Sequence, residues 1–308
     1  AAALTSISSV GALTLTIDKE YTSALTLALV ATNDTVTGTA YTGDMSITYA
    51  ADNLDTNDTL IGGTGTNDSI TVSGAGAVAL TSTDLTNVSA FEKIIIGTDA
   101  GAGAVTLVDG NVASAKSLTV DGTALVSTNA LTFIGTAETN GAVTVLGGAG
   151  DDLITSTASS VGDTLKGGAG ADTFTFATTS LSSVDTVQGD GGTDILTFSN
   201  SGTVSDADFT NISTLETVTA LANNGTTIIT VGALAAAAGV VTLNATDNVN
   251  TFTLGAGFTN NATVALTNDT STIVATEYTK ALTVTIADDD LTTADTITGG
   301  TGADTITM

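Results

Sequence analysis

The chain has 308 residues, with 32 acidic residues against five lysines, and its formal charge is −27. Without a basic surface it is not expected to bind nucleic acid or anionic membranes, and its apolar runs, such as 233–241, are too short to span a bilayer. No histidine is present, which excludes a Ser-His-Asp triad and an HExxH zinc site, and no cysteine is present for disulfides. A hydrophobic content of 42% argues against disorder and for a folded β protein.

Short apolar runs separated by Gly, Asn and Asp predict many short strands and little helix. In chain order the predicted strands are 13–17, 25–30, 46–49, 69–72, 93–96, 105–108, 117–120, 131–134, 143–146, 226–231, 240–243, 251–254, 263–266, 272–275 and 282–286. Many of them lie about 11 to 15 residues apart, which fits either a solenoid or a sandwich.

Between these strands a glycine-rich acidic motif recurs. Its copies are Gly62, Gly63 and Gly65 with Asn67 and Asp68; Gly147, Gly148 and Gly150 with Asp152; Gly167, Gly168 and Gly170 with Asp172; Gly189, Asp190 and Gly192 with Asp194; and Gly299, Gly300 and Gly302 with Asp304. A degenerate copy occupies 97–101. The motif matches the nonapeptide GGxGxDxUx of calcium-binding β-rolls. We therefore predict an all-β fold, a parallel β-solenoid or β-roll with glycine-rich calcium loops.

The chemistry of the motif suits Ca²⁺ as the cofactor. Calcium takes six to eight oxygen ligands in flexible geometry. Glycines let the backbone turn so that its carbonyl groups converge, and the aspartate adds charge. Stacked loops would hold an ion between them. The alternative is a set of Asp/Gly turns between hairpin strands.

Spacing assigns the aspartates to two edges of a flattened coil. Nine residues separate Asp163 from Asp172, Asp185 from Asp194, and Asp295 from Asp304. One edge would carry Asp152, Asp172 and Asp194, and the opposite edge Asp163 and Asp185, whose loops lack the glycines. We expect better calcium sites on the glycine edge. Asp58 and Asp295, which precede the first and last glycine loops, complete the candidate ligands.

Longer repeats are also present. Residues 83–92 reappear as 207–216, each with a D-x-x-N-(V/I) turn, and 47–61 align without gaps to 284–298. The predicted organisation is an N-terminal β segment (1–51), a glycine loop with a strand stack (52–146), a β-roll (147–198), a second stack (199–287) and a last repeat (288–308). We expect that repeat to be truncated or completed by a neighbouring molecule, which makes Gly299 the candidate meeting point between chains.

These motifs resemble the RTX (repeats-in-toxin) calcium-binding proteins, most closely at 147–198 and 288–308 and moderately at 52–72. Composition is similar to that of RTX-type bacterial surface-layer proteins. The resemblance implies type I secretion and calcium-dependent self-assembly into sheets on the outer cell surface, with cell-surface polysaccharide as a further partner. It assigns the sixth-position ligand to Asp152, Asp172, Asp194 and Asp304, and to Asn67 or Asp68. Asp190 departs from the motif, and a C-terminal secretion signal is not recognisable.

Other functions stay open at this point. Paired carboxylates can hydrolyse glycosides, but the acidic clusters of note, 288–290 and 151–152, are expected to be turns or calcium ligands, and Trp and Arg are absent. We therefore expect no enzyme. A calcium-stiffened adhesin, matrix or filament subunit is the main alternative. Thr-x-Thr runs at 14–16, 251–253 and 283–285 fit an ice-binding surface locally, but they form no long uniform ladder.

Overall fold

The computed structural model describes residues 6–30, 33–50, 53–98, 100–221, 225–246, 249–267, 270–287 and 291–308. The chain divides into two compact units, Ala1–Ala169 and Gly170–Met308, and each is a parallel β-solenoid with almost no helix. The predicted fold class is therefore confirmed. The 288–290 acidic cluster and Asp99 of the degenerate 97–101 motif lie outside the described residues.

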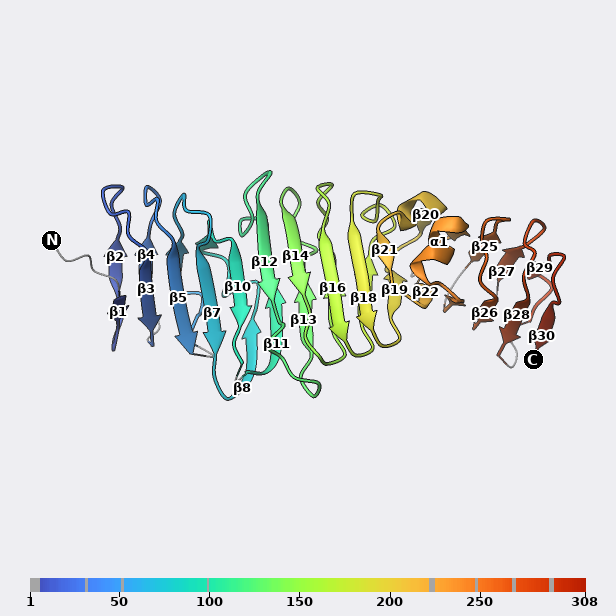
Figure 1. Ribbon diagram of the computed structural model, residues 1–308, viewed down its shortest axis with the longest axis horizontal. Coiled ribbons are helices and arrows are strands. Elements are labelled where there is room, and N and C mark those ends of the chain that lie inside the picture. Colours follow the sequence, from blue (N-terminus) through green and yellow to red (C-terminus); the bar gives the residue numbers. More distant parts are fainter. Residues whose placement is uncertain are drawn as a thin grey trace. The chain divides into compact units, whose positions relative to one another are not determined.

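The first unit contains three parallel sheets (Figure 1). Sheet I consists of β1 (Ser6–Ser8), β3 (Leu25–Leu29), β5 (Met45–Ala50), β7 (Ser69–Ser73), β10 (Lys93–Ile96), β12 (Ser117–Asp121), β14 (Ala142–Leu146) and β16 (Thr164–Ala169). Sheet II consists of β2 (Thr14–Thr16), β4 (Thr35–Thr37), β6 (Thr59–Ile61) and β9 (Val88–Ser89). Sheet III consists of β8 (Gly76–Leu80), β11 (Ala100–Thr106), β13 (Leu131–Ile134) and β15 (Leu153–Thr155).

The second unit also has three sheets. Sheet IV consists of β18 (Thr186–Gly191) and β21 (Ile212–Ser213). Sheet V consists of β17 (Thr173–Phe176), β19 (Ile195–Phe198), β22 (Thr217–Ala220), β24 (Thr242–Ala245), β26 (Ala262–Leu266), β28 (Leu282–Ile286) and β30 (Thr305–Thr307). Sheet VI consists of β20 (Gly202–Val204), β23 (Thr227–Val231), β25 (Asn250–Leu254), β27 (Ser271–Val274) and β29 (Thr296–Thr298).

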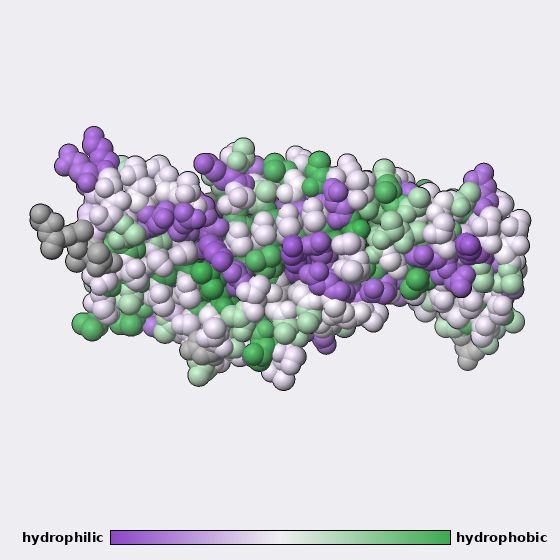
Figure 2. Space-filling view, in the orientation of Figure 1, coloured by the Kyte–Doolittle hydropathy of each residue, from purple (hydrophilic) through white to green (hydrophobic). Residues whose placement is uncertain are grey.

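Aliphatic ladders form the core of each unit. Because side chains alternate along a strand, one residue in two points inward and meets its equivalent one turn away. In sheet I the buried ladder runs through Leu27, Ile47, Ile70, Ile94, Val120, Val145 and Leu165. In sheet V it runs through Phe174, Leu196, Val218, Leu243, Val264 and Val284. The outward positions are mostly Thr and Ser, which leaves the visible surface largely pale in hydropathy (Figure 2).

The D-x-x-N turns lie where the coil exchanges one sheet for another. In the first unit β8 is the first strand of sheet III and β9 the last strand of sheet II; in the second, β20 is the first strand of sheet VI and β21 the last of sheet IV. Each such turn of the coil has three strands instead of two. Asn87 Nδ2 donates to Thr56 O at 3.3 Å and Asn211 Nδ2 to Ser183 O at 2.8 Å. The motif asparagine therefore ties the turn to the coil turn before it.

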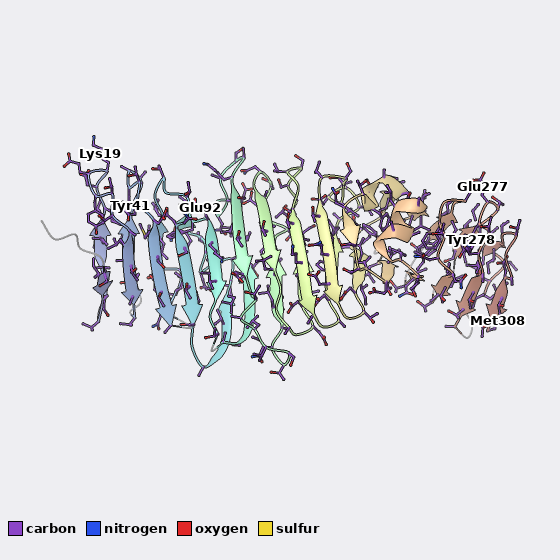
Figure 3. All side chains as sticks on the ribbon, viewed as in Figure 1. Lys19, Tyr41, Glu92, Glu277, Tyr278 and Met308 are labelled. Carbon is purple, nitrogen blue, oxygen red and sulfur yellow. The ribbon has the colours of Figure 1, made fainter. Side chains whose placement is uncertain are left out.

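The 47–61 and 284–298 repeats follow equivalent aromatic turns. The Tyr41 hydroxyl donates to Ser23 O at 2.6 Å and Asp44 O at 3.1 Å. The Tyr278 hydroxyl donates to Asn260 O at 2.5 Å and Ala281 O at 3.1 Å. Both rings are fully buried (Figure 3). In each repeat the next glycine loop stacks directly on the tyrosine. The main-chain amide of Thr64 donates a hydrogen bond to Tyr41 O, and that of Thr301 donates one to Tyr278 O.

Most predicted strands are present within one or two residues, and 93–96, 131–134 and 282–286 coincide with β10, β13 and β28. The 105–108 and 240–243 predictions are displaced, because β11 begins at Ala100 and β24 begins at Thr242. The apolar run 233–241 contains a short α-helix, α1 (Ala233–Ala238), and a 3₁₀ turn, η1 (Asp206–Phe209), precedes β21. Alanine has the highest helix propensity, which accounts for the helix where the strand pattern lapses.

Candidate calcium loops

Each glycine loop joins the end of one strand to the start of a strand in another sheet. The 62–68 loop lies between β6 and β7, the 147–152 loop between β14 and β15, and the 299–304 loop between β29 and β30. The 189–194 motif begins within β18, which ends at Gly191, and leads to β19. The 167–172 motif begins within β16 and leads to β17, and the boundary between the two units falls after Ala169.

The motif aspartates turn their carboxylates inward to main-chain amides. Asp152 Oδ1 accepts the amide of Leu131 at 2.6 Å, one coil turn earlier, and Oδ2 accepts the amide of Gly148 in its own loop at 2.6 Å. Asp68 does the same with Met45 (2.6 Å) and Gly63 (2.7 Å). Asp304 repeats the pattern with Leu282 (3.2 Å) and Gly300 (3.0 Å), but it is exposed. Each carboxylate thus links two successive turns.

This geometry distinguishes Asn67 from Asp68, which the sequence left open. Asp68 is fully buried and occupies the same place as Asp152 and Asp304. Asn67 is exposed, and its Nδ2 donates to Asp44 Oδ2 at 3.4 Å on the outside of the coil. The extra residue in this loop is therefore absorbed at Thr66–Asn67, and Asp68 holds the position of the motif aspartate.

In three loops the first glycine leaves room for oxygen atoms. A Cβ on Gly147 would overlap Gly167 O of the next turn and Asp152 Oδ2. A Cβ on Gly189 would overlap Thr214 O and Asp194 Oδ2, and one on Gly62 would overlap Ala90 O. A carboxylate and a carbonyl oxygen from the following turn therefore approach the same small volume. Only glycine permits this approach, and both atom types are ligands that calcium prefers.

The last two loops of the β-roll adopt a second backbone form. Gly168 and Gly170 have φ of 110° and 125°, and Asp190 and Gly192 have φ of 66° and 150°. Asp190, which replaces a motif glycine, keeps the left-handed conformation that Asp tolerates better than most residues. Its side chain is exposed. The Asp172 amide donates to Asp194 Oδ1 at 2.9 Å, so these two motif aspartates stack in consecutive turns as the spacing predicted.

The glycine-free edge carries a different turn. Asp163, before β16, accepts the Val143 amide at 3.0 Å and the amide and hydroxyl of Thr157 at 3.1 and 2.8 Å. Asp185 accepts the amide and hydroxyl of Ser182. Asp295 and Asp58 are held in the same way, by Ser271 and Thr292 and by Asp34 and Asp55. In these turns main-chain amides or Ser and Thr hydroxyls occupy carboxylate oxygens.

Burial disfavours the ionised form of three loop aspartates. It raises the pKa of Asp68, Asp152 and Asp194, and acidic neighbours add to the effect: Asp44 for Asp68, Asp151 for Asp152, and Glu216 and Asp190 for Asp194. A bound dication would reverse this penalty. No three acidic side chains gather into a metal site by themselves among the described residues. The donor set therefore fits calcium only when main-chain carbonyl groups take part.

Sequence reasoning missed two acidic residues at these loops. Glu92 Oε2 accepts the Asp68 amide at 2.8 Å, and Glu216 Oε2 accepts the Asp194 amide at 2.8 Å. Each glutamate ends a copy of the 83–92 and 207–216 repeat, and this shared position was the available signal. Burial also raises the pKa of Glu92, with the Asp68 charge adding to the effect.

Comparison with known families matches residues 139–159, 157–175 and 291–307 to the RTX calcium-binding nonapeptide repeat. The chain therefore carries RTX-type repeats, at the 147–152, 167–172 and 299–304 loops. No curated protein and no solved structure matches the chain. A helix with the length and apolar character needed to cross a bilayer is not found in the described part of the chain.

Proposed function

We propose that this chain is an extracellular, calcium-dependent structural protein that self-assembles into a layer on a bacterial cell surface. The observation that carries the proposal is the recurrence of glycine loops in which a buried aspartate carboxylate and a carbonyl of the next turn approach one volume. Three glycine loops of the chain, 147–152, 167–172 and 299–304, match a calcium-binding repeat family, and the 147–152 loop also shows this approach. Ions bound in an array of such loops would link successive turns of the coil and so stabilise it.

Calcium would act by ligand-linked folding. Binding to the folded state alone stabilises it by RT ln(1 + [Ca]/Kd), or roughly 2.7 kcal/mol per site at 100 times Kd. Several sites together would rival the whole stability of a typical domain, about 5–15 kcal/mol. The chain would stay loose where calcium is scarce and fold where it is plentiful. RTX repeat proteins are typically secreted, which agrees with folding that begins only outside the cell.

Self-association is the proposed use of the folded coil, with cell-surface polysaccharide as an anchoring partner. The outward positions of the strands are small and polar, and the acidic surface would be bridged by calcium between molecules. We propose no catalytic role, because histidine is absent and the buried acids serve main-chain amides. An adhesin, matrix or filament subunit remains the second candidate, since the same stiff coil would suit end-to-end joining.

Calcium removal tests the proposal. Purified protein in calcium should show β circular dichroism and large particles by light scattering, and chelation with EGTA should abolish both. Re-addition of calcium should restore them, whereas magnesium, which demands octahedral geometry, should not. Electron micrographs of the calcium-loaded protein should show a two-dimensional lattice. Filaments would favour the second candidate, and unchanged dichroism and particle size in EGTA would refute calcium dependence.

A further inference from the structure

We propose that the 214–216 turn closes a divalent-cation site against the 189–194 glycine loop, with Asp194 Oδ2 and the Thr214 carbonyl oxygen as two of its ligands. The inference deepens the calcium dependence proposed above and rests on it. It assigns a ligand role to a turn that has no glycine motif and lies outside the residues that match the RTX repeat.

The two oxygens face the same small volume above Gly189. A Cβ added to this glycine would overlap both Thr214 O and Asp194 Oδ2, each at less than 3.0 Å. Oxygen ligands at about 2.3–2.6 Å from a calcium ion fit such a space, whereas a side chain does not. Glu216 positions the aspartate, because its Oε2 accepts the Asp194 amide at 2.8 Å.

Asp194 Oδ2 is an independent observation that points to a cation. Asp194 is 1% exposed, its Oδ1 accepts the Asp172 amide, and its Oδ2 is buried with no hydrogen-bond partner among the described residues. A buried carboxylate oxygen without a donor costs free energy unless a cation or water meets it. The neighbouring atom, Thr214 O, is also a hydrogen-bond acceptor and cannot donate a hydrogen bond to the carboxylate. A cation between the two oxygens would be attracted by both.

The first unit contains the same arrangement with its carboxylate already satisfied. There, Ala90 O lies over Gly62, and Glu92 holds the Asp68 amide at 2.8 Å. However, the Gly63 amide donates to Asp68 Oδ2 at 2.7 Å. The corresponding amide in the second unit, that of Asp190, donates instead to the Thr214 hydroxyl at 2.8 Å. The threonine hydroxyl therefore diverts the amide and leaves Asp194 Oδ2 available for an ion.

Thr214 adopts a strained backbone conformation that the matching turn of the first unit shares. Its φ is 51°, and a β-branched residue is poorly suited to the left-handed region. Ala90 adopts nearly the same conformation, with φ of 58°, at the matching position. The two turns therefore differ in the side chain, because only Thr214 has a hydroxyl that accepts the amide of the facing loop. Threonine at 214 is thus explained by its hydroxyl.

The test compares Thr214→Ala with Thr214→Ser, which keeps the hydroxyl, and Thr193→Ala, an exposed threonine of the same loop. Bound Ca²⁺ per chain is measured by equilibrium dialysis across a range of free calcium, with circular dichroism as the check on folding. Thr214→Ala should weaken one site by roughly tenfold or more, because the Asp190 amide can then turn to Asp194 Oδ2. Thr214→Ser and Thr193→Ala should match the wild type. Equal binding by folded Thr214→Ala would overturn the inference.

A second measurement does not depend on the variants. Crystals of the wild-type protein grown with calcium and exchanged with terbium should give an anomalous peak within coordination distance of Asp194 Oδ2 and Thr214 O. A peak elsewhere in the glycine loops and none here would refute this site and leave the proposed function standing. Failure of the wild-type protein to bind any calcium would refute both.

Discussion

At the scale of single residues, the buried acids form ladders that hold strand starts in register. Each one accepts a main-chain amide from the turn before it: Leu13 for Asp34, Met45 for Asp68, and Leu131 for Asp152. The exposed Asp304 accepts the Leu282 amide in the same way. A hydrogen bond to a charged acceptor contributes about 1.5–3 kcal/mol, more than a neutral one. These aspartates therefore stabilise the coil even before calcium binds, so the calcium-binding motif is also a strand cap.

Glycine substitution tests the close approach at the loops. Gly147→Ala should lower the free energy of unfolding by at least about 2 kcal/mol, because its Cβ would overlap Gly167 O and Asp152 Oδ2. Gly110→Ala is the matched control, since no atom of the described part of the chain lies within 4 Å of its Cβ. Urea unfolding of both variants in saturating calcium measures the difference. Equal stability of the two variants would contradict the packing described for the loop.

An ion pair on sheet I is expected to make a pH-dependent contribution to the free energy of unfolding. Lys93 Nζ lies 2.7 Å from Asp121 Oδ2. Burial acts to raise the pKa of Asp121, but the Lys93 and Thr123 hydrogen bonds outweigh it and the pKa lies below its usual value. A lowered folded-state pKa means that the stabilisation is present above the unfolded pKa, about 3.9, and is lost as the pH falls through the folded pKa.

Lys93→Met should therefore destabilise the protein at pH 7 and have little effect near pH 2. The lysine is 38% exposed, so solvent screening limits the difference at pH 7 to under about 1 kcal/mol. Denaturant unfolding of the two proteins across this pH range measures it. A difference that stayed constant down to pH 2 would show that lost packing, and not the ion pair, is responsible.

At the scale of elements, the 3₁₀ turn η1 does more than connect strands. In the second unit Asp206 of η1 accepts the amides of Gly232 (2.7 Å), Leu234 (3.2 Å) and Ala235 (2.9 Å), so it caps the N-terminus of α1 from another coil turn. Neither α1 nor its N-cap Gly232 supplies a side-chain cap. This six-residue helix is too short to be stable alone.

Asp206→Ala should accordingly lower the free energy of unfolding by about 1–3 kcal/mol, because three amides lose a charged acceptor. Glu277→Ala removes an exposed acid from the same unit and should be nearly neutral. Thermal unfolding in saturating calcium compares them, and amide hydrogen exchange at 233–238 should quicken only in Asp206→Ala. Unchanged exchange there would show that the cap is dispensable.

Local patterns predicted the elements that are locally determined. Alternation of Val, Ile and Leu with Thr located about half of the described strands, and glycine with aspartate located the loops. The exchange of sheets at β8–β9 and β20–β21 was not predictable, because it depends on which strand of a distant turn supplies the hydrogen bonds. For the same reason Glu92 and Glu216 escaped notice: their partners are amides 24 and 22 residues away. Asn67 and Asp68 are neighbours in the sequence, and which of the two side chains points inward depends on how the loop joins the following strand.

At the scale of the whole molecule, charge is the dominant constraint. A formal charge of −27 destabilises any compact state, and among the described residues one ion pair, Lys93–Asp121, offsets it. Salt screens such repulsion, since the Debye length falls from about 10 Å at 0.1 M to about 3 Å at 1 M. Calcium also screens the repulsion between acidic side chains. When bound at a loop, it additionally compensates the buried carboxylates for the water contacts that they lost on folding.

Sodium and calcium should therefore stabilise the protein to very different extents. In EDTA, raising NaCl from 0.1 to 1 M should raise the melting temperature gradually, because it weakens repulsion between exposed acids only. A few millimolar CaCl₂ adds almost nothing to the ionic strength, yet it should raise the melting temperature further than 1 M NaCl, since stabilisation by specific binding follows ln(1 + [Ca]/Kd). Differential scanning calorimetry along both series separates the two effects. If NaCl of matched ionic strength reproduced the calcium effect, calcium would be acting as a screening ion, and the buried carboxylates would have no role in its binding.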